Sequence, residues 1–589
     1  MIQDEFDTFA VFAIVLVCVA TLAVGAFGLR LSRTTSDFYV ASRTVTPWWN
    51  ASAIGGEYLS AASFLGVAGL ILAYGADMLW FPVGYTAGYL VLLVLVAAPL
   101  RRSGAYTLPD FAEARLESLA ARRTASVLVV TIGWLYLLPQ FQAAGLTVRT
   151  VTGAPRWVGP VLVCVVVLIG VLSGGMRSIT FVQAFQYWLK LTALAVPAVF
   201  ILLVWQSHGT PTINQEGPPV FVAATTVEIQ TGVSVEVSES VRVDAVGVVN
   251  GEPVDGTLEL TPGVHALAQG TEVTFPAGAE IPHADSLRPL GGQDWLAPLR
   301  SNSDYPLYST YSLILALFFG TMGLPHVLVR FYTNPDGRAA RRTTVAVLGL
   351  LGIFYLLPTA YGALGRLYAP DLLLTGRTDA VVLLLPGRLV DGVPGDALSA
   401  LVTAGAFAAF LSTSSGLTIS VAGVLSQDLI GRRVRNPVRA FRLGASLALI
   451  VPITLALISP SLGIADVVGL AFAVAASSFC PLLLLGIWWR RLTDAGAIAG
   501  LVTGGGLSTL AVLTTLVLAP TGGWWTPALA QPAAWTMPIA FLVMVLVSLA
   551  TPRRVAKGVS RTMIRLHTPE SVDLDRGDWD PEDRWRVRT

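Results

Sequence analysis

The chain has 589 residues, of which 54% are hydrophobic and only 13% are charged. Soluble domains usually carry about twice that charged fraction, so this composition excludes an ordinary soluble protein. The 38 basic and 37 acidic side chains give a formal net charge of +1. The chain therefore has no overall positive electrostatic potential that would attract nucleic acid. Apolar runs recur along almost the whole sequence, and we predict one polytopic membrane domain with additions.

The apolar runs predict thirteen membrane-spanning helices, since a spanning helix needs about 20 mostly apolar residues. The expected spans are approximately 7–30, 48–75, 78–100, 124–148, 157–174, 180–205, 306–331, 343–365, 396–429, 440–459, 463–488, 493–518 and 536–551. The first residues are acidic where a signal peptide would be basic, so we keep the first run as a helix. The three cysteines lie inside apolar runs and show no spacing typical of a metal site or a disulfide framework: Cys18, Cys164 and Cys480.

Basic residues near the helix ends predict the orientation, because Arg and Lys favour the cytoplasmic side. With the N-terminus outside, most of them fall in inside segments, among them Arg101, Arg102, Arg330 and Arg342. We therefore expect a multi-pass protein of the cytoplasmic membrane of a bacterium, with its N-terminus outside and its C-terminus inside.

Composition divides the chain into four parts. Residues 1–205 hold the first six expected spans and 306–552 hold the rest. Residues 206–305 are polar, with alternation typical of strands and an Asn250-Gly251 hairpin signal, and predict a small extracytoplasmic β-rich insert; a disordered loop is the alternative. Residues 553–589 are charged without an apolar period and predict a mostly disordered cytoplasmic tail.

The second expected span is interrupted near its middle. Two adjacent glycines, Gly55 and Gly56, are followed there by Glu57. Glycine pairs loosen helices, and carbonyls freed at membrane depth must line a cavity or bind an ion. Close helix packing is the alternative, because small residues recur on this face at Gly56, Ser60, Ser63 and Gly66.

The seventh expected span carries a second interruption. Gly320, Gly323 and Pro325 disfavour a continuous helix there. The two broken spans open successive groups of five, spans 2–6 and 7–11, and they enter the membrane from opposite sides. This arrangement is typical of inverted repeats, the first from about residue 48 and the second to about 488, whose half-helices meet at a solute site near the midplane.

The ninth expected span is rich in hydroxyl groups between residues 410 and 428. Thr413, Gly416, Ser420 and Gly423 recur at helical spacing, with Ser412 beside them. Hydroxyl oxygens and exposed carbonyls are hard, neutral ligands that suit a dehydrated alkali cation. The alternative is that each hydroxyl bonds a carbonyl of the preceding helical turn.

Four segments together resemble the sodium/solute symporter family, most closely its cation/acetate, or monocarboxylate, branch. They are residues 56–66, 174–183, 320–331 and 416–428, in the family's order. The resemblance covers roughly residues 5–205 and 306–550. It implies an all-α polytopic membrane protein with a leucine-transporter-like fold, in which two inverted five-helix repeats form a ten-helix core, with one helix before it and two after.

The resemblance also implies positions for the ligands. A Na⁺ site would combine two backbone carbonyls with two hydroxyls, from Gly56, Leu59, Ser412 and Thr413. The solute would bind between the second and seventh spans, with predicted contacts at Tyr58, Ser60, Thr321 and Gly323. Gln183 stands where sugar and proline members carry an aspartate, which puts their accessory sodium route in doubt here.

Three ionisable residues at membrane depth are further candidates for coupling, because a charge there costs roughly 2.5–3.5 kcal/mol on insertion scales. Glu57 could balance a cation, carry a proton or form a structural pair. His326 is predicted to bond a backbone carbonyl. Lys190 and Lys557 are the only lysines, and we expect Lys190 to face the cavity, pairing with Glu57 or offering positive charge to a carboxylate; a structural pair with another acid is the alternative.

The sequence therefore predicts a secondary active transporter that imports a small monocarboxylate of the acetate, propionate or pyruvate class with Na⁺ by alternating access. Coupling to H⁺ is one alternative, and another solute such as proline, a sugar or urea is a second. A membrane-embedded enzyme or sensor is disfavoured, because the sequence holds no nucleotide-binding loop, zinc-protease motif or nucleophile elbow. We expect no cofactor beyond the coupling ion, and the oligomeric state stays open.

Overall fold

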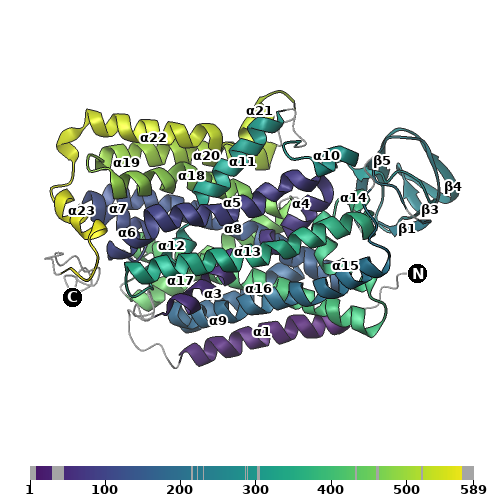
Figure 1. Ribbon diagram of the computed structural model, residues 1–589, viewed down its shortest axis with the longest axis horizontal. Coiled ribbons are helices and arrows are strands. Elements are labelled where there is room, and N and C mark those ends of the chain that lie inside the picture. The colour runs from purple at the N-terminus through teal and green to yellow at the C-terminus, as the bar shows by residue number, and fades with distance from the viewer. Residues whose placement is uncertain are drawn as a thin grey trace.

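The computed structural model describes residues 8–29, 45–213, 217–221, 223–229, 231–285, 287, 289–300, 305–430, 434, 436–458, 463–518 and 522–572. A long helical bundle carries a small sheet at one end, and the C-terminal part of the chain lies at the other end (Figure 1). The predicted start of the first span at residue 7 and the last part of the predicted disordered tail, residues 573–589, lie outside the described residues.

Helices before the insert occupy residues 8–207. They are α1 (Thr8–Leu29), α3 (Pro47–Tyr58), η2 (Ala62–Gly66), α4 (Val67–Tyr74), η3 (Gly75–Leu79), α5 (Trp80–Val91), η4 (Leu92–Val96), α6 (Ala97–Arg102), α7 (Leu108–Leu116), α8 (Leu119–Thr152) and α9 (Val158–Ser207). Apolar residues surround most of them, so their backbone groups must pair within the helix, as lipid requires.

Helices after the insert occupy residues 292–567. They are α10 (Gly292–Leu296), α11 (Pro306–Thr321), α12 (Pro325–Phe331), α13 (Gly337–Tyr368), α14 (Leu372–Thr375), η5 (Thr378–Ala380), α15 (Val381–Leu389), α16 (Val393–Val424), η6 (Leu425–Ile430), α17 (Pro437–Ile458), α18 (Ile464–Trp488), α19 (Asp494–Gly500), η7 (Leu501–Gly505), α20 (Gly506–Leu518), α21 (Trp525–Ala530), α22 (Ala533–Ala550), η8 (Pro552–Arg554) and α23 (Val559–His567).

Among the described residues, 11 helical runs are long and apolar enough to cross a membrane. The expected count of thirteen differs for two reasons. The run Ala62–Arg102 joins two expected spans across the η3 turn, where Gly75 has a φ of 68°. The expected fifth span is the shorter apolar helix Val158–Leu172.

Helix α9 contains the fifth and sixth expected spans. Gly159, near its start, packs against the C-terminal part of α8. His208, just after its end, lies 3.3 Å from the Tyr368 hydroxyl at the end of α13. Arg377 follows α13 and bonds Thr150 at the end of α8. Both ends of α9 therefore lie near one end of the bundle, and its two halves cross the bundle in opposite directions.

The predicted β-rich insert is confirmed. Its seven strands are β1 (Thr225–Glu228), β2 (Val233–Val237), β3 (Val241–Val249), β4 (Glu252–Leu260), β5 (Gly263–Leu267), β6 (Glu272–Phe275) and β7 (His283–Ala284). The sheet order is β1-β6-β3-β5-β2-β7, with β4 paired to β3. Asn250 and Gly251 have φ values of 53° and 83° in the β3–β4 hairpin, which explains why that dipeptide marks the turn.

Hydrogen bonds to the bundle hold the residues that follow the sheet. The Trp295 indole donates to the Leu72 carbonyl at 3.1 Å, and the Leu290 amide donates to the Ala73 carbonyl at 3.1 Å. The Leu299 amide donates to Asp77 Oδ1 at 3.0 Å. The insert is therefore anchored to the α4–η3 corner of the bundle.

The prediction of a disordered tail from residue 553 is wrong for its first part. Helix α23 has Met563 and Leu566 buried, because its apolar residues fall on one face and pack against the bundle. Arg565 Nε donates to the Arg102 carbonyl at 3.1 Å, and the Gly558 amide donates to Glu117 at 2.9 Å. Short-range composition does not reveal such docking, because it depends on the partner surface.

Candidate cation and solute site

The first predicted break is present, but it lies at Leu59 and not at Gly55 and Gly56, which remain helical. Helix α3 ends at Tyr58, and Leu59 leaves the helical region with φ −74° and ψ 84° before the chain turns helical again. The side-chain oxygen of Gln140, on α8, accepts from the Ala61 amide at 3.0 Å and satisfies one donor freed by the break. The carbonyls released at the same point face other side chains.

The second predicted break is also present. Helix α11 ends at Thr321 and α12 begins at Pro325, with Leu324 extended between them. A Cβ atom on Gly320 or Gly323 would lie 2.5 or 2.6 Å from a backbone carbonyl of α18. These glycines therefore let the broken helix approach α18 closely, and any side chain there would force the two apart.

The predicted hydroxyls of α16 lie at the first break and are fully buried. The Thr413 hydroxyl donates to the Glu57 carbonyl at 2.6 Å. The Ser412 hydroxyl donates to the Ala409 carbonyl at 3.1 Å and accepts from Lys190 at 2.6 Å. The structure thus brings the four predicted cation ligands together around the end of α3.

Lys190, on α9, fills the centre of this group. Its ammonium donates to the Gly56 carbonyl, to the Leu59 carbonyl at 2.7 Å and to the Ser412 hydroxyl at 2.6 Å. An ammonium has three N–H donors, so all of them are used. Within the described part of the chain, no carboxylate lies within 4.0 Å of the Lys190 nitrogen.

Glu57 pairs with Arg330 and not with Lys190, which corrects one of the two roles expected for that lysine. Arg330 Nε lies 2.7 Å from Glu57 Oε2, and the side chains are only 1% and 2% exposed. Arg330 also donates to the Thr180 hydroxyl at 2.7 Å and to Gln183 Oε1. Gln183 in turn donates to the Ser412 carbonyl at 2.9 Å, so it links the ion pair to α16.

Arg330 is therefore a buried residue and not a charge at the surface end of its span. Its carbonyl accepts from Asn50 at 3.0 Å, which adds a second tie between α12 and α3. The sequence analysis places Arg330 among the inside-loop charges, because it follows the break in the seventh span. One signal could have found it: apolar residues flank it on both sides in the run 327–331.

Three of the four predicted solute residues, Tyr58, Ser60 and Thr321, lie near one another beside the breaks. The Tyr58 hydroxyl is 2.9 Å from the Thr321 hydroxyl and donates to the Tyr85 carbonyl at 3.2 Å. Ser60 accepts from the Tyr136 hydroxyl at 3.5 Å. Gly323 lies against α18 instead of beside these hydroxyls.

Aromatic rings from three helices, α5, α13 and α18, form a cluster around Tyr58, and the sequence analysis does not single them out. Tyr58 packs edge-on against Tyr89 with ring centroids 4.9 Å apart, and lies 6.2 Å from Phe472. Tyr85 is 5.1 Å from Phe472 and stacks on Tyr355 at 5.9 Å. Single aromatic residues in apolar spans carry no sequence signal of a site, because most of them are ordinary core residues.

His326 differs from its prediction as a histidine bonded to a carbonyl. Neither ring nitrogen has a hydrogen-bond partner in the described part of the chain. The ring packs on Tyr136 with centroids 5.1 Å apart. The hydroxyls of Tyr85 and Tyr89 likewise lack partners among the described residues. Most buried polar groups are paired, so these unpartnered atoms mark a place where a ligand could supply the missing contacts.

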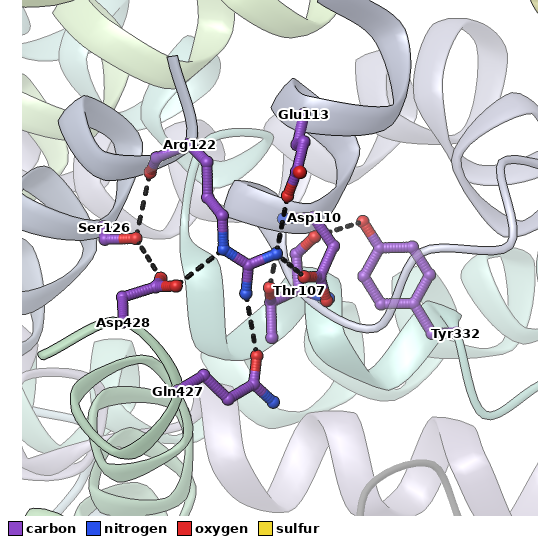
Figure 2. A network of polar contacts seen from close by, with 8 residues as sticks. All are labelled: Thr107, Asp110, Glu113, Arg122, Ser126, Tyr332, Gln427 and Asp428. Atoms are coloured by element: carbon purple, nitrogen blue, oxygen red, sulfur yellow. Dashed lines mark hydrogen bonds and ion pairs between the residues drawn. The ribbon is translucent and has the colours of Figure 1, made fainter. Parts of the chain in front are cut away.

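A separate charged network lies between α7, α8 and η6 (Figure 2). Arg122 donates to Asp110 at 2.6 Å, to Glu113 at 2.9 Å and to Asp428 at 2.6 Å. Its remaining nitrogen donates to Gln427 at 3.0 Å. Because η6 directly continues α16, this network fixes the far end of the helix that carries Ser412 and Thr413.

Comparisons with known proteins decide the family. The profile of the sodium:solute symporter family matches residues 38–216 and 284–504, which is more than half of the chain. The chain belongs to the sodium:solute symporter family. The expected family is thus confirmed, and the protein is a multi-pass membrane transporter and not an enzyme.

One curated protein and one solved structure are similar to this chain. An uncharacterized symporter of Bacillus subtilis (strain 168), YwcA, is 29% identical over 541 residues, covering 89% of this chain and 90% of that protein. A solved structure of a Na⁺-coupled sialic acid symporter in a substrate-bound, outward-open state superposes with a TM-score of 0.62 at 14% identity. It covers 94% of this chain and 99% of its own, and it confirms the leucine-transporter-like fold.

A second similar structure is that of Mhp1, a nucleobase-cation-symport-1 family transporter, in a closed conformation with bromovinylhydantoin bound. It superposes with a TM-score of 0.48 at 12% identity, over 90% of this chain and 99% of that chain.

Proposed function

We propose that this symporter imports a small monocarboxylate, of the acetate, propionate or pyruvate class, by alternating access coupled to a cation gradient. The observation that carries the proposal is the meeting of two broken helices, α3 and α11–α12, beside the buried hydroxyls of α16. Broken helices offer unpaired backbone groups to ions and solutes at membrane depth. Movement at the breaks would open this region to each side in turn.

The charges around the first break favour an anionic solute. Glu57, Arg330 and Lys190 are all buried there, and together they carry a formal charge of +1 when ionised. A buried net charge is costly, and a bound carboxylate would neutralise it. Proline, sugars and urea would leave it unbalanced.

The unpartnered polar atoms favour a solute with a hydrogen-bond acceptor. The Tyr85 and Tyr89 hydroxyls and the His326 ring can each donate a hydrogen bond, and a carboxylate has two acceptor oxygens. Tyr58, Ser60 and Thr321 remain the predicted contacts beside them. The surrounding aromatic rings offer apolar contacts that suit the short chain of an acetate or propionate kind of solute.

Sodium is the coupling ion that the family name suggests, and the ligands that the resemblance implies for it are Gly56, Leu59, Ser412 and Thr413. Proton coupling is the second candidate. The observation that favours it is the Lys190 ammonium, which already contacts three of those four residues.

Uptake of labelled acetate, propionate and pyruvate into proteoliposomes tests the proposal. Uphill uptake should follow an inward Na⁺ gradient at fixed pH, or an inward H⁺ gradient without Na⁺, and unlabelled monocarboxylates should compete for it. If proline, a sugar or urea competes instead, the solute belongs to that class and not to the monocarboxylates. A His326→Gln variant should lower uptake, whereas His567→Gln, in the tail helix, should not.

A further inference from the structure

We infer that the ammonium of Lys190 itself serves as the cation of the site formed by Gly56, Leu59 and Ser412, so that Na⁺ does not bind there in the natural protein. The inference deepens the proposed function, on which it rests, because it concerns the cation half of the symport. The family resemblance implies that these oxygens bind Na⁺, whereas in the structure they accept hydrogen bonds from the Lys190 ammonium.

The geometry of the ammonium matches that of a bound cation. Two carbonyls come from the break in α3, and the hydroxyl comes from α16, so Lys190 joins the same two elements that a sodium ion would join. The carbonyls are available only because the helix stops at Tyr58. The fourth proposed ligand, the Thr413 hydroxyl, is committed to the Glu57 carbonyl at 2.6 Å.

A sodium ion does not fit beside this ammonium. The Lys190 nitrogen already bonds three of the proposed ligands, so an ion sharing them would lie within a few ångströms of a like charge. At about 4 Å and an effective dielectric constant of about 20, that repulsion weakens binding roughly a thousandfold. Glu57 cannot relieve it, because its carboxylate is held by Arg330 at 2.7 Å.

The anchoring of Lys190 on α9 explains how a fixed cation can hold the break. Gly56 packs directly on α9, where a Cβ atom would lie 2.1 Å from the Gln183 carbonyl. The lysine stem therefore needs to span only the short distance between packed helices. A diffusible ion would be released in each transport cycle, whereas this charge stays with the protein.

Sodium binding to the purified protein tests the inference without relying on transport. The wild type should show no saturable binding of radioactive Na⁺, and its thermal unfolding temperature should be the same in Na⁺ and in choline. Lys190→Ala frees the Gly56 and Leu59 carbonyls and the Ser412 hydroxyl, so Na⁺ should bind and raise its unfolding temperature. The matched control is Lys557→Ala, at the exposed second lysine, which should behave as the wild type.

Two results of the Na⁺-binding measurements would overturn the inference about Lys190. Saturable Na⁺ binding to the wild type would overturn the inference, whatever the variants do. A folded Lys190→Ala protein that gains no Na⁺ response would overturn it as well, and Lys190→Gln serves as the second variant should the alanine protein not fold. Failure of monocarboxylate uptake in proteoliposomes would remove the proposed function alone, because the Na⁺-binding measurements do not depend on the solute.

Discussion

The buried pair of Glu57 and Arg330 shows how strongly one residue can depend on another in this bundle. Removing one partner of a buried ion pair leaves the other charge uncompensated and costs about 3–5 kcal/mol. We expect Arg330→Met to lower the thermal unfolding temperature markedly in detergent, and Glu57→Gln to do so as well. The double variant should lose less than the sum of the two, because no lone charge remains.

A more exposed pair provides the control for that experiment. Arg388 and Asp371 lie 2.6 Å apart with side chains 31% and 16% exposed. Exposed pairs contribute about 0–1 kcal/mol, so Arg388→Met should change the unfolding temperature little. An Arg330→Met protein as stable as Arg388→Met would contradict a structural dependence on the buried pair.

The Tyr58 hydroxyl offers a second test at the residue scale. Tyr58→Phe removes its contacts with the Thr321 hydroxyl and the Tyr85 carbonyl. Thr321 keeps its own bond to the Leu317 carbonyl at 2.8 Å, so we expect the protein to fold. One hydrogen bond contributes about 1 kcal/mol, which predicts a KM for solute roughly fivefold higher.

Tyr361→Phe is the matched control for Tyr58→Phe. Its hydroxyl donates to the Leu194 carbonyl at 3.3 Å, away from both breaks. Uptake kinetics should leave its KM unchanged. Equal changes in the two variants would show that Tyr58 acts on packing and not on the solute.

At the scale of elements, the packing of α3 on α9 depends on the absence of a side chain at Gly56. A Cβ atom there would lie 2.1 Å from the Gln183 carbonyl of α9. We expect Gly56→Ala to separate the two helices and abolish uptake, as measured in proteoliposomes. Gly349→Ala, in α13, has no atom within 4 Å of the new Cβ and should retain uptake with about 0.5–1 kcal/mol of added stability.

Both breaks could be predicted from the sequence, but only the second falls at the residues that mark it, since the first lies at Leu59, and Gly56 stays helical and packs on α9. The grouping of the α16 hydroxyls with the α3 carbonyls also followed from the family resemblance. The partner of Glu57 could not be predicted, since it depends on how α12 returns towards α3 after the second break. The contact of Lys190 with carbonyls could not be predicted for the same reason. A sequence indicates which charges are buried, but not which oxygen atoms lie beside them.

For the whole molecule, the sheet and α23 lie at opposite ends of the bundle (Figure 1). We predict that the insert lies outside and the tail inside, and the separation of the two ends lets labelling test that orientation. In intact cells, a membrane-impermeant thiol reagent should label Val246→Cys on the exposed side of β3, and should label Lys557→Cys only after permeabilisation. Cys18 and Cys480 are buried and Cys164 is half-buried, so labelling of the wild type measures the background. Labelling of Lys557→Cys alone in intact cells would show that the protein has the opposite orientation, with the tail outside and the insert inside.

The complete burial of Lys190 also makes the protein a reporter of its own opening. Lys557 is exposed, and replacing it with arginine would leave one side-chain amine in the chain, sealed between α3, α9 and α16. An acylating reagent should reach that amine only while these helices stand apart. The rate at which the adduct forms, followed by mass spectrometry, would then measure how often these helices separate. A solute that holds the helices together should slow adduct formation.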